Sequence, residues 1–353
     1  MRITKLDGLR GIFSFMIIFF HYDNRILPEF VSQNFVKNGA WIFVEFFFVL
    51  SGYVISYNYD NLSTKNEFWI YLKKRFIRLY PLLFFTIMVY FLFELLGSTI
   101  LKSFINTPET VPSLILATID SLLFTNSTPI FGDTDGGMNS PSWSISAEMI
   151  SYIVFGLATI YLSKKNKTIF YICLILVSMS ILLKFKPPVN YFFLRAFVSF
   201  SLGYLLFKVS KFRIPFKDWM EYLIPIALLL VMYMIHDNTF GLAHFNGNFT
   251  INIIFFFSIL MLLKTDGTIT RILDSPFVQF LGKISYSVYL NHLLIITVLP
   301  RFFFKILKIE QNTYTEVGVL IFLCILILVY SALTYKYIEL KGSKFLKSKL
   351  LKR

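Results

Sequence analysis

The sequence predicts an all-α fold, a polytopic transmembrane helical bundle of about ten spans with both termini in the cytoplasm. Of the 353 residues, 56% are hydrophobic and only 15% are charged, whereas soluble domains carry about 25% charged residues. The mean hydropathy is +0.67, and 42 Phe and 20 Tyr suit lipid-facing helices with aromatic belts. The net charge of +14 comes from short basic clusters between apolar runs, which is typical of cytoplasmic loops and argues against nucleic acid as a partner.

The apolar segments are interpreted as one membrane domain, residues 1–353, with no soluble C-terminal domain. The first segment is short, because a spanning helix needs about 20 residues. A further stretch, residues 111–124, contains Asp120 and is interpreted as a partly embedded or interfacial helix, with a true span as the alternative. The predicted spans are residues 9–23, 40–57, 79–97, 143–163, 168–184, 190–207, 219–236, 250–264, 284–303 and 317–335.

The distribution of lysine and arginine predicts how the bundle is oriented. If the N-terminus is cytoplasmic, most of the 34 basic residues fall in loops on the cytoplasmic side, and an even number of spans also keeps the basic tail there. The N-terminal residues lack a small-residue cleavage site after a short apolar region, so no cleaved signal peptide is expected.

The first span carries two polar residues on one face. Arg10 and His21 are eleven positions apart, so on a helix they share a face and lie about 16 Å apart along its axis. Arg10 then lies at one boundary of the membrane and His21 well inside a hydrocarbon core about 30 Å thick. An imidazole at that depth is usually functional, although His21 could instead sit in the outer interface, solvated by water.

Four further ionisable residues interrupt apolar spans: Glu45, Glu148, Arg195 and His292. Together with His21 they could converge on one buried polar site. Arg195 is expected to neutralise a carboxylate, with Glu45 as the candidate partner. Glu148 precedes no charge of opposite sign on its own helix and is favoured as functional. The two cysteines lie isolated in apolar segments without ligand spacing, so neither a disulfide nor a metal site is expected.

A basic cluster occupies residues 73–81. Arg75 and Arg78 are three positions apart and would project from the same helical turn, and Pro81 restricts how the next helix starts. Such a cluster often serves only as a stop for membrane insertion. The alternative is a cytoplasmic anion site, because the planar fork of arginine matches phosphate oxygens, and Arg10 would lie at the same level.

Five motifs follow one another along the chain. They are Arg10 with His21; Phe46-Phe47-Phe48-Val49-Leu50-Ser51-Gly52-Tyr53 preceded by Glu45; Arg75, Arg78 and Pro81; Trp143, Ser144 and Glu148; and Leu281, Gly282, Ser285, Tyr286, Tyr289, Leu290 and His292. With these motifs the chain resembles the integral-membrane acyltransferase-3 family. Glu45 stands where the family commonly has aspartate. The tail Tyr337-Ile338-Glu339 is similar to the family's terminal element, with Leu340 where proline often follows.

The resemblance implies a membrane-bound, acyl-CoA-dependent O-acyltransferase of the bacterial cytoplasmic membrane. It would transfer an acyl group, most often acetyl, to a hydroxyl of an extracytoplasmic polysaccharide or lipid-linked glycan. Acyl-CoA would be the donor substrate, with no tightly bound cofactor, and its phosphates would bind at Arg75, Arg78 and Arg10. His21 would be the general base, with Glu148 or Glu45 orienting its imidazole.

The remaining candidates have less defined roles. Ser144, Ser146 and Tyr286 are possible donors to the tetrahedral oxyanion. Direct transfer is favoured over an acyl-histidine intermediate. The further site candidates are Ser51, Gly52, Trp143, Arg195 and His292. Two other functions stay open at this point, a transporter or flippase for a polysaccharide precursor and a non-catalytic assembly or sensor protein, because intramembrane charges are equally expected of carriers.

Overall fold

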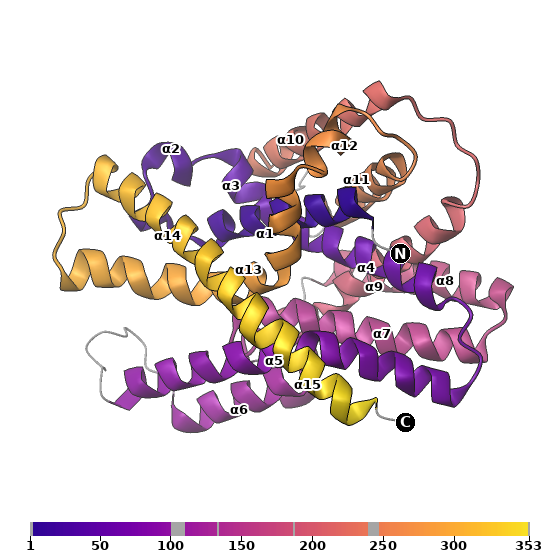
Figure 1. Cartoon of the computed structure of the whole chain (residues 1–353), viewed down its shortest axis with the longest axis horizontal. Helices are drawn as coiled ribbons and strands as arrows, with labels where there is room; N and C mark the ends of the chain where they lie inside the picture. Colours follow the sequence, from indigo (N-terminus) through magenta and orange to yellow (C-terminus); the bar gives the residue numbers. More distant parts are fainter. Residues whose placement is uncertain (1–2, 100–109, 133, 186–187, 239–246, 352–353) are drawn as a thin grey trace.

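The computed structural model describes residues 3–99, 110–132, 134–185, 188–238 and 247–351. Within these ranges the chain is helical and has no strand, which confirms the all-α prediction (Figure 1). The longer helices are α1 (Thr4–His21), α4 (Phe43–Tyr59), α5 (Lys65–Thr99), α6 (Val111–Leu122), α7 (Trp143–Tyr161), α8 (Lys164–Lys184), α9 (Phe193–Val209), α10 (Leu223–His236), α11 (Gly247–Leu262), α13 (Pro276–Arg301), α14 (Thr313–Thr334) and α15 (Lys341–Leu350). Short helices include α2 (Glu29–Ser32), α3 (Phe35–Gly39) and α12 (Thr268–Leu273).

Eight helices in the described ranges are long and apolar enough to cross a membrane, and all eight coincide with predicted spans. The other two predicted spans correspond to α1 and α11. Neither is among the eight: α1 has 18 residues but three of them, Lys5, Asp7 and Arg10, are charged, and α11 is shorter, with 16 residues. The 12 residues of α6 extend about 18 Å, less than a 30 Å hydrocarbon core, which fits a partly embedded helix better than a span.

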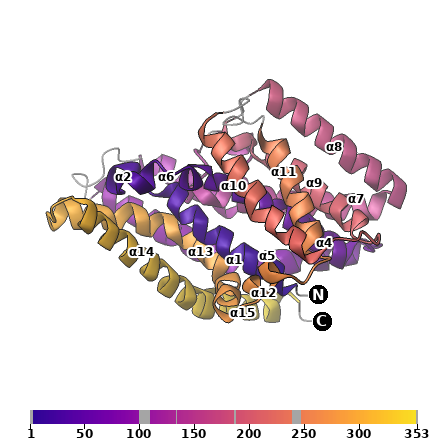
Figure 2. The same ribbon diagram turned by 90° about the horizontal axis from the view of Figure 1, so that it is seen from above.

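Helices α1 and α13 pack closely and run parallel, and both figures of the ribbon show them side by side (Figures 1 and 2). Glycines allow this approach. A Cβ on Gly11 would lie 2.4 Å from the amide nitrogen of Gly282, and a Cβ on Gly282 would lie 2.4 Å from the carbonyl oxygen of Asp7. Small residues at a membrane helix interface let two backbones approach and gain van der Waals contact. The first and last motifs of the chain therefore form a single interface.

Gly52 has a comparable role in a different interface. A Cβ on Gly52 would lie 2.1 Å from the carbonyl oxygen of Phe200, and one on Gly203 would lie 2.2 Å from that of Val49. These contacts join α4 to α9. The structure thus places Gly52 at a helix-packing contact, whereas its neighbour Ser51 faces the cavity described below.

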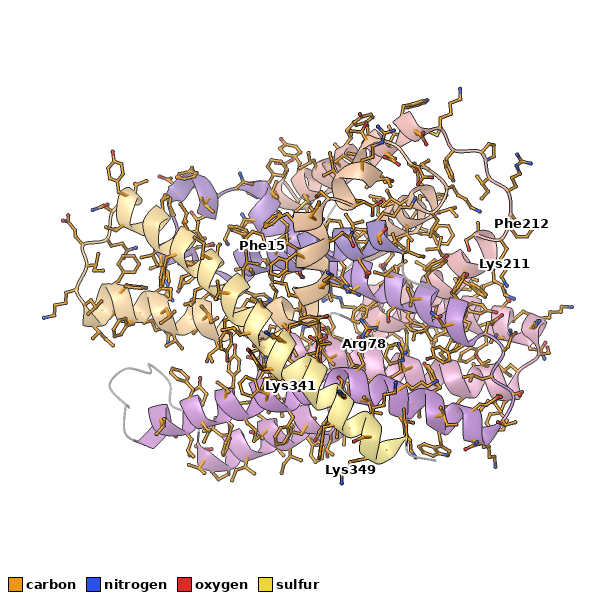
Figure 3. All side chains as sticks on the ribbon, viewed as in Figure 1. Phe15, Arg78, Lys211, Phe212, Lys341 and Lys349 are labelled. Carbon is orange, nitrogen blue, oxygen red and sulfur yellow. The ribbon has the colours of Figure 1, made fainter. Side chains whose placement is uncertain are left out.

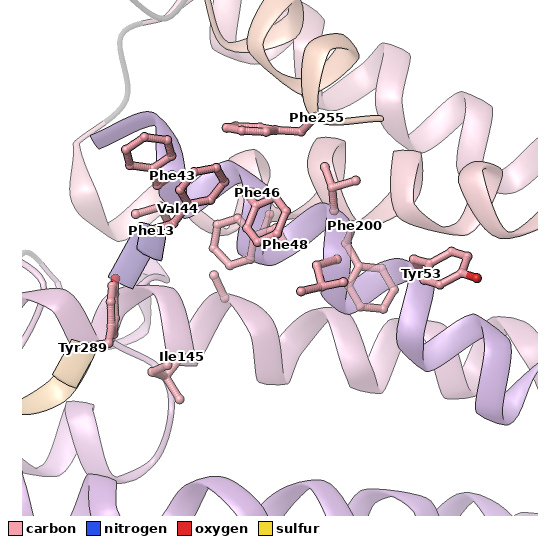
Figure 4. Packing of buried hydrophobic residues seen from close by; sticks show 14 of the residues in the cluster. Phe13, Phe43, Val44, Phe46, Phe48, Tyr53, Ile145, Phe200, Phe255 and Tyr289 are labelled. Carbon is pink, nitrogen blue, oxygen red and sulfur yellow. The ribbon is translucent and has the colours of Figure 1, made fainter. Parts of the chain in front are cut away.

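Aromatic rings fill the space between α1, α4 and α11 (Figure 4). Phe13 stacks on Phe43 with ring centroids 4.0 Å apart, and Phe46 packs edge-on against Phe255 at 5.6 Å. All four rings are buried, so this cluster fixes α4 relative to α1.

Helix α5 includes Pro81 in its interior, whereas the sequence led us to expect this proline near the start of a helix. Proline has no N–H to donate to the carbonyl four residues earlier, which is that of Ile77. The hydroxyl of Ser343 on α15 donates to this carbonyl at 2.9 Å and satisfies it. Arg75 and Arg78 therefore lie on the same continuous helix as the span that follows them.

Several predicted cytoplasmic loops meet through polar contacts. Lys5 forms an ion pair with Asp266 at 2.9 Å, and Lys264 donates to the carbonyl of Ser210 at 2.7 Å. Lys167 in the first turn of α8 pairs with Asp60 at the end of α4. These contacts agree with loops that share one side of the membrane. Assignment of that side to the cytoplasm remains a prediction from the basic-residue bias.

Candidate active site

A cavity of about 370 Å³ lies between five helices, α1, α4, α5, α7 and α13. The residues of α1 that line the cavity all lie in the first half of that helix, up to Arg10. The polar side chains in the wall are Asp7, Arg10, Ser51, Arg75, Arg78, Ser144, Glu148, Tyr152, Ser285, Tyr286 and Tyr289. Members of all five sequence motifs therefore contribute to one cavity.

Arg10 is held in place by α13. Its Nε donates to the hydroxyl of Ser285 at 2.8 Å, and its Nη2 donates to the carbonyl of Gly282 at 2.8 Å. Asp7, one turn earlier on α1, lies 3.4 Å from Nη2. These contacts turn a long, flexible side chain into a fixed part of the cavity wall.

Arg78 is the most available cation of the cavity. Its side chain is solvent-accessible although the residue lies deep in the molecule, towards the centre of the view in Figure 3. Within the described part of the chain it forms no hydrogen bond or ion pair, and the acids that act on it electrostatically are Glu148 and Glu339. Arg75, one turn away, donates from Nη2 to the hydroxyl of Tyr59 at 3.2 Å, while its buried Nε has no partner in the described residues. Together these guanidinium groups present free donors to an anion.

Glu148 lines the cavity from α7, within a cluster of three side chains. Its Oε1 accepts a hydrogen bond from the hydroxyl of Ser51 at 2.5 Å and another from that of Tyr152 at 2.5 Å. The two hydroxyl oxygens are themselves 2.8 Å apart. The structure thus brings together Ser51 and Glu148, which the sequence indicated as separate site candidates, whereas sequence reasoning missed Tyr152. The signal was its position four residues after Glu148, on the same face of α7.

The cavity is also lined by hydroxyl-bearing side chains of α7 and α13 with fixed partners. The hydroxyl of Tyr289 lies 2.8 Å from that of Ser144 and donates to the carbonyl of Pro141 at 3.1 Å. The hydroxyl of Tyr286 donates to the carbonyl of Leu79 at 2.8 Å. Ser146 lies outside the lining and bonds Ser127 and the carbonyl of Phe124. Of the three suggested oxyanion donors, Ser144 and Tyr286 therefore border the cavity.

His21 does not line the cavity. It is half-buried at the far end of α1, with its ring centroid 5.2 Å from that of His292. His292 is fully buried, and its ring lies 6.1 Å from that of Tyr289, which does line the cavity. The order along α13 is therefore Tyr289 at the cavity and His292 one turn further on, next to His21.

Glu45 and Arg195 form a buried ion pair away from the cavity. Nη2 of Arg195 lies 2.6 Å from Oε1 of Glu45, and Ser199 donates to the other carboxylate oxygen at 2.5 Å. The guanidinium also lies 5.1 Å from the ring of Trp143. The expected neutralisation of a carboxylate by Arg195 is thus seen, with Glu45 as its partner. Trp143 packs on this pair. Neither Glu45 nor Glu148, the two acids considered as partners of His21, is in contact with that histidine.

Glu339 is a further acid near the arginines, next to α13. It lies in a π-helical turn, Tyr335–Leu340, and accepts a hydrogen bond from Ser287 at 3.0 Å. It acts electrostatically on Arg10 and Arg78. The residues that the structure describes contain no group of three His, Cys, Asp or Glu side chains that could hold a metal ion.

Comparison with known proteins identifies the family of this chain. The model of the acyltransferase domain family matches residues 3–336, and the chain belongs to this acyltransferase-3 family of multi-pass membrane proteins. A protein of Staphylococcus aureus strain COL named "Putative O-acetyltransferase" is 26% identical over 96% of this chain and 56% of its own length. Its counterpart in strain MSSA476, of the same name, is 25% identical over 95% of this chain and 56% of its own length.

The chain thus spans little more than half the length of the curated relatives it matches. No solved structure is significantly similar to it. Family membership and the names of the relatives support O-acyl transfer as the class of activity.

Proposed function

We propose that this protein transfers an acyl group, most simply acetyl, from cytoplasmic acyl-CoA to a hydroxyl of an extracytoplasmic polysaccharide or lipid-linked glycan. The observation that carries the proposal is the accessible guanidinium of Arg78 in a cavity shared with Arg75 and Arg10. Accessible arginines with free donors inside a membrane protein are expensive unless they bind an anion, and phosphates match their planar fork. In this proposal they bind the phosphates of coenzyme A.

The position of His21 supports a reaction beyond the cavity. Arg10 and His21 are about 16 Å apart along α1, and the extended pantetheine arm has a reach of about 15–20 Å. A thioester whose phosphates rest on the arginines therefore reaches the level of His21. An acceptor hydroxyl arriving from the opposite side of the membrane meets it there.

His21 serves as the general base in this scheme, because a neutral imidazole has one ring nitrogen with a free lone pair that can accept a proton. As the acceptor oxygen attacks the thioester carbonyl carbon, its proton moves to His21. The tetrahedral intermediate then collapses, the carbon–sulfur bond breaks, and the thiolate of coenzyme A takes up the proton. The products are an ester of the glycan and free coenzyme A.

Glu148 is assigned a different role from the one considered from the sequence. Its carboxylate is bound by Ser51 and Tyr152 within the cavity, and no contact joins it to His21. In the proposal this cluster lines the path of the acyl-pantetheine arm, and Glu148 holds Ser51 and Tyr152 in fixed positions along it.

Complementation of a gene deletion tests the proposal. Envelope glycans are compared by mass spectrometry for ester-linked acetyl groups in cells that produce the wild-type protein, His21→Ala or His236→Ala. The last variant is the matched control, since His236 is an exposed histidine at the end of α10. Wild type and His236→Ala should restore acetylation, whereas His21→Ala should fold and bind acetyl-CoA without restoring it. Full acetylation in cells with His21→Ala would refute the role of His21.

A further inference from the structure

His292 and His21 are the one pair of histidines in the described residues whose rings are in contact. The glycine contacts between α1 and α13 hold the helices in a fixed parallel register, with Arg10 at Ser285 and His21 at His292. The two imidazole centroids are 5.2 Å apart and the rings are inclined by 44°. The histidine pair is therefore a product of the same interface that positions Arg10.

The surroundings of His292 define which of its nitrogens carries a proton. Nδ1 lies 3.2 Å from the carbonyl oxygen of Val288, one turn earlier on α13. A carbonyl oxygen can only accept, so Nδ1 is the N–H in the neutral ring, and Nε2 is left as an acceptor. Nε2 is buried and has no hydrogen-bond partner within the described residues. A buried acceptor without a donor typically costs about 1–3 kcal/mol. We therefore expect a donor to bind Nε2 of His292 in the working state of the protein.

His21 is well placed to be that donor. Two imidazoles joined by a linear N–H···N hydrogen bond have centroids about 5 Å apart, because the nitrogens are about 2.9 Å apart and each lies about 1.1 Å from its ring centre. The observed spacing of 5.2 Å matches this value. The last side-chain torsion of histidine is broad, so a rotation of the His21 ring can bring an N–H to Nε2 without moving either helix.

We propose that His292 is a positioning residue that fixes the tautomer and orientation of His21 by accepting a hydrogen bond at Nε2. This inference rests on the proposed function, in which His21 is the base. With one nitrogen of His21 donating to His292, the other nitrogen keeps a free lone pair and faces the acceptor hydroxyl. His292 then orients His21 as the aspartate of a Ser-His-Asp triad orients its histidine, but it does so as a neutral acceptor.

The proton balance of the reaction is unchanged by this arrangement. The hydroxyl proton moves to the free nitrogen of His21 while the carbon–oxygen bond forms. The resulting imidazolium carries two N–H groups, one of which stays bound to Nε2 of His292. The other proton passes to the thiolate when the carbon–sulfur bond breaks, and His21 returns to its starting tautomer.

Two substitutions of His292 by polar residues of similar size distinguish a positioning role of this side chain from a packing role. His292→Asn places an amide near the position of Nδ1, where it keeps a donor for the carbonyl of Val288 but supplies nothing at Nε2. His292→Gln extends one bond further and places an amide oxygen near Nε2. Initial rates are measured in membrane vesicles from the natural host lacking the wild-type gene, which hold the endogenous acceptor, with radiolabelled acetyl-CoA as donor. His236→Asn is the matched histidine control.

The maximal rate should fall about 10–100-fold in His292→Asn, while the KM for acetyl-CoA should change less than about twofold. His292→Gln should retain at least about ten times the rate of His292→Asn, and His236→Asn should match wild type. Equal rates for the Gln and Asn variants would overturn the inference. An inactive His21→Ala together with a fully active His292→Asn would overturn it and leave the proposed function intact, whereas an active His21→Ala would overturn the proposed function itself.

A measurement on the wild-type protein does not depend on the folding of any variant at position 292. The chain has only four histidines, so ¹⁵N NMR of histidine-labelled protein in nanodiscs resolves them individually. His292 should be a neutral ring protonated at Nδ1, with an Nε2 that accepts a hydrogen bond. A ring protonated at Nε2 would overturn the inference.

Discussion

Arg10 donates from Nε to the hydroxyl of Ser285 at 2.8 Å, across 275 positions of sequence. This contact sets the register of α1 against α13, and the same register brings His21 to His292 eleven residues further along α1. The anion-binding end and the histidine end of the candidate site are therefore coupled through one rigid helix pair. Changes in the packing of this pair should affect both ends.

Gly282→Ala tests this coupling. A Cβ there would lie 2.4 Å from the backbone oxygen of Asp7, which cannot move aside as a flexible side chain would. We expect α1 to be displaced and the free energy of unfolding to fall by about 1–3 kcal/mol, with loss of acetyl-CoA binding. Thermal unfolding in detergent and calorimetry measure the two effects. Gly318→Ala is the control, because a Cβ at Gly318 meets nothing within 4 Å, and unaltered stability of Gly282→Ala would contradict the close contact.

Arg78→Ala tests the anion site. Loss of a charged hydrogen bond to a phosphate should weaken acetyl-CoA binding by roughly 1–3 kcal/mol. Arg78→Lys should restore only part of this loss, because an ammonium cannot reproduce the planar fork. Lys74→Ala is the matched control, an exposed cation on the same helix outside the cavity. Unchanged affinity in Arg78→Ala and Arg75→Ala would mean that these arginines serve only membrane topology.

Some of these features follow from the sequence for clear physical reasons. A bilayer demands long apolar helices, so eight spans could be found from hydropathy alone. An isolated charge in a membrane needs a partner, so the pairing of Arg195 with Glu45 could be anticipated. The convergence of Arg10, Arg75 and Arg78 followed from their common depth.

Other features depend on which faces of two helices meet, and depth along a helix does not determine that. The sequence suggested that Glu148 and His21 converge on one buried site, but in the structure the carboxylate of Glu148 is bound by Ser51 and Tyr152. In the same way, Gly52 and Ser51 are neighbours in a motif yet face α9 and the cavity respectively. Pro81, expected near the start of a helix, lies inside α5, and a donor from a distant helix satisfies the carbonyl freed by proline.

Arg195→Met tests the buried ion pair. The variant leaves the carboxylate of Glu45 buried with Ser199 as its remaining donor, and the free energy of unfolding should fall by about 3–5 kcal/mol. The double variant Glu45→Gln/Arg195→Met removes both charges and should recover part of that stability. Thermal unfolding in detergent measures both. A double variant less stable than Arg195→Met would show that the two side chains do not act as a pair.

A double-mutant cycle tests the cluster around Glu148. Ser51→Ala and Tyr152→Phe each remove one of the two hydroxyl donors to Oε1, and each single variant leaves the other donor in place. The double variant leaves the carboxylate without either, so the combined loss of stability should exceed the sum of the single losses by about 0.5–3 kcal/mol. Adding Glu148→Gln to the double variant should remove most of this excess, since a neutral amide is less costly to leave without donors. Strict additivity of the two single variants in thermal unfolding would show that Glu148 does not depend on them jointly.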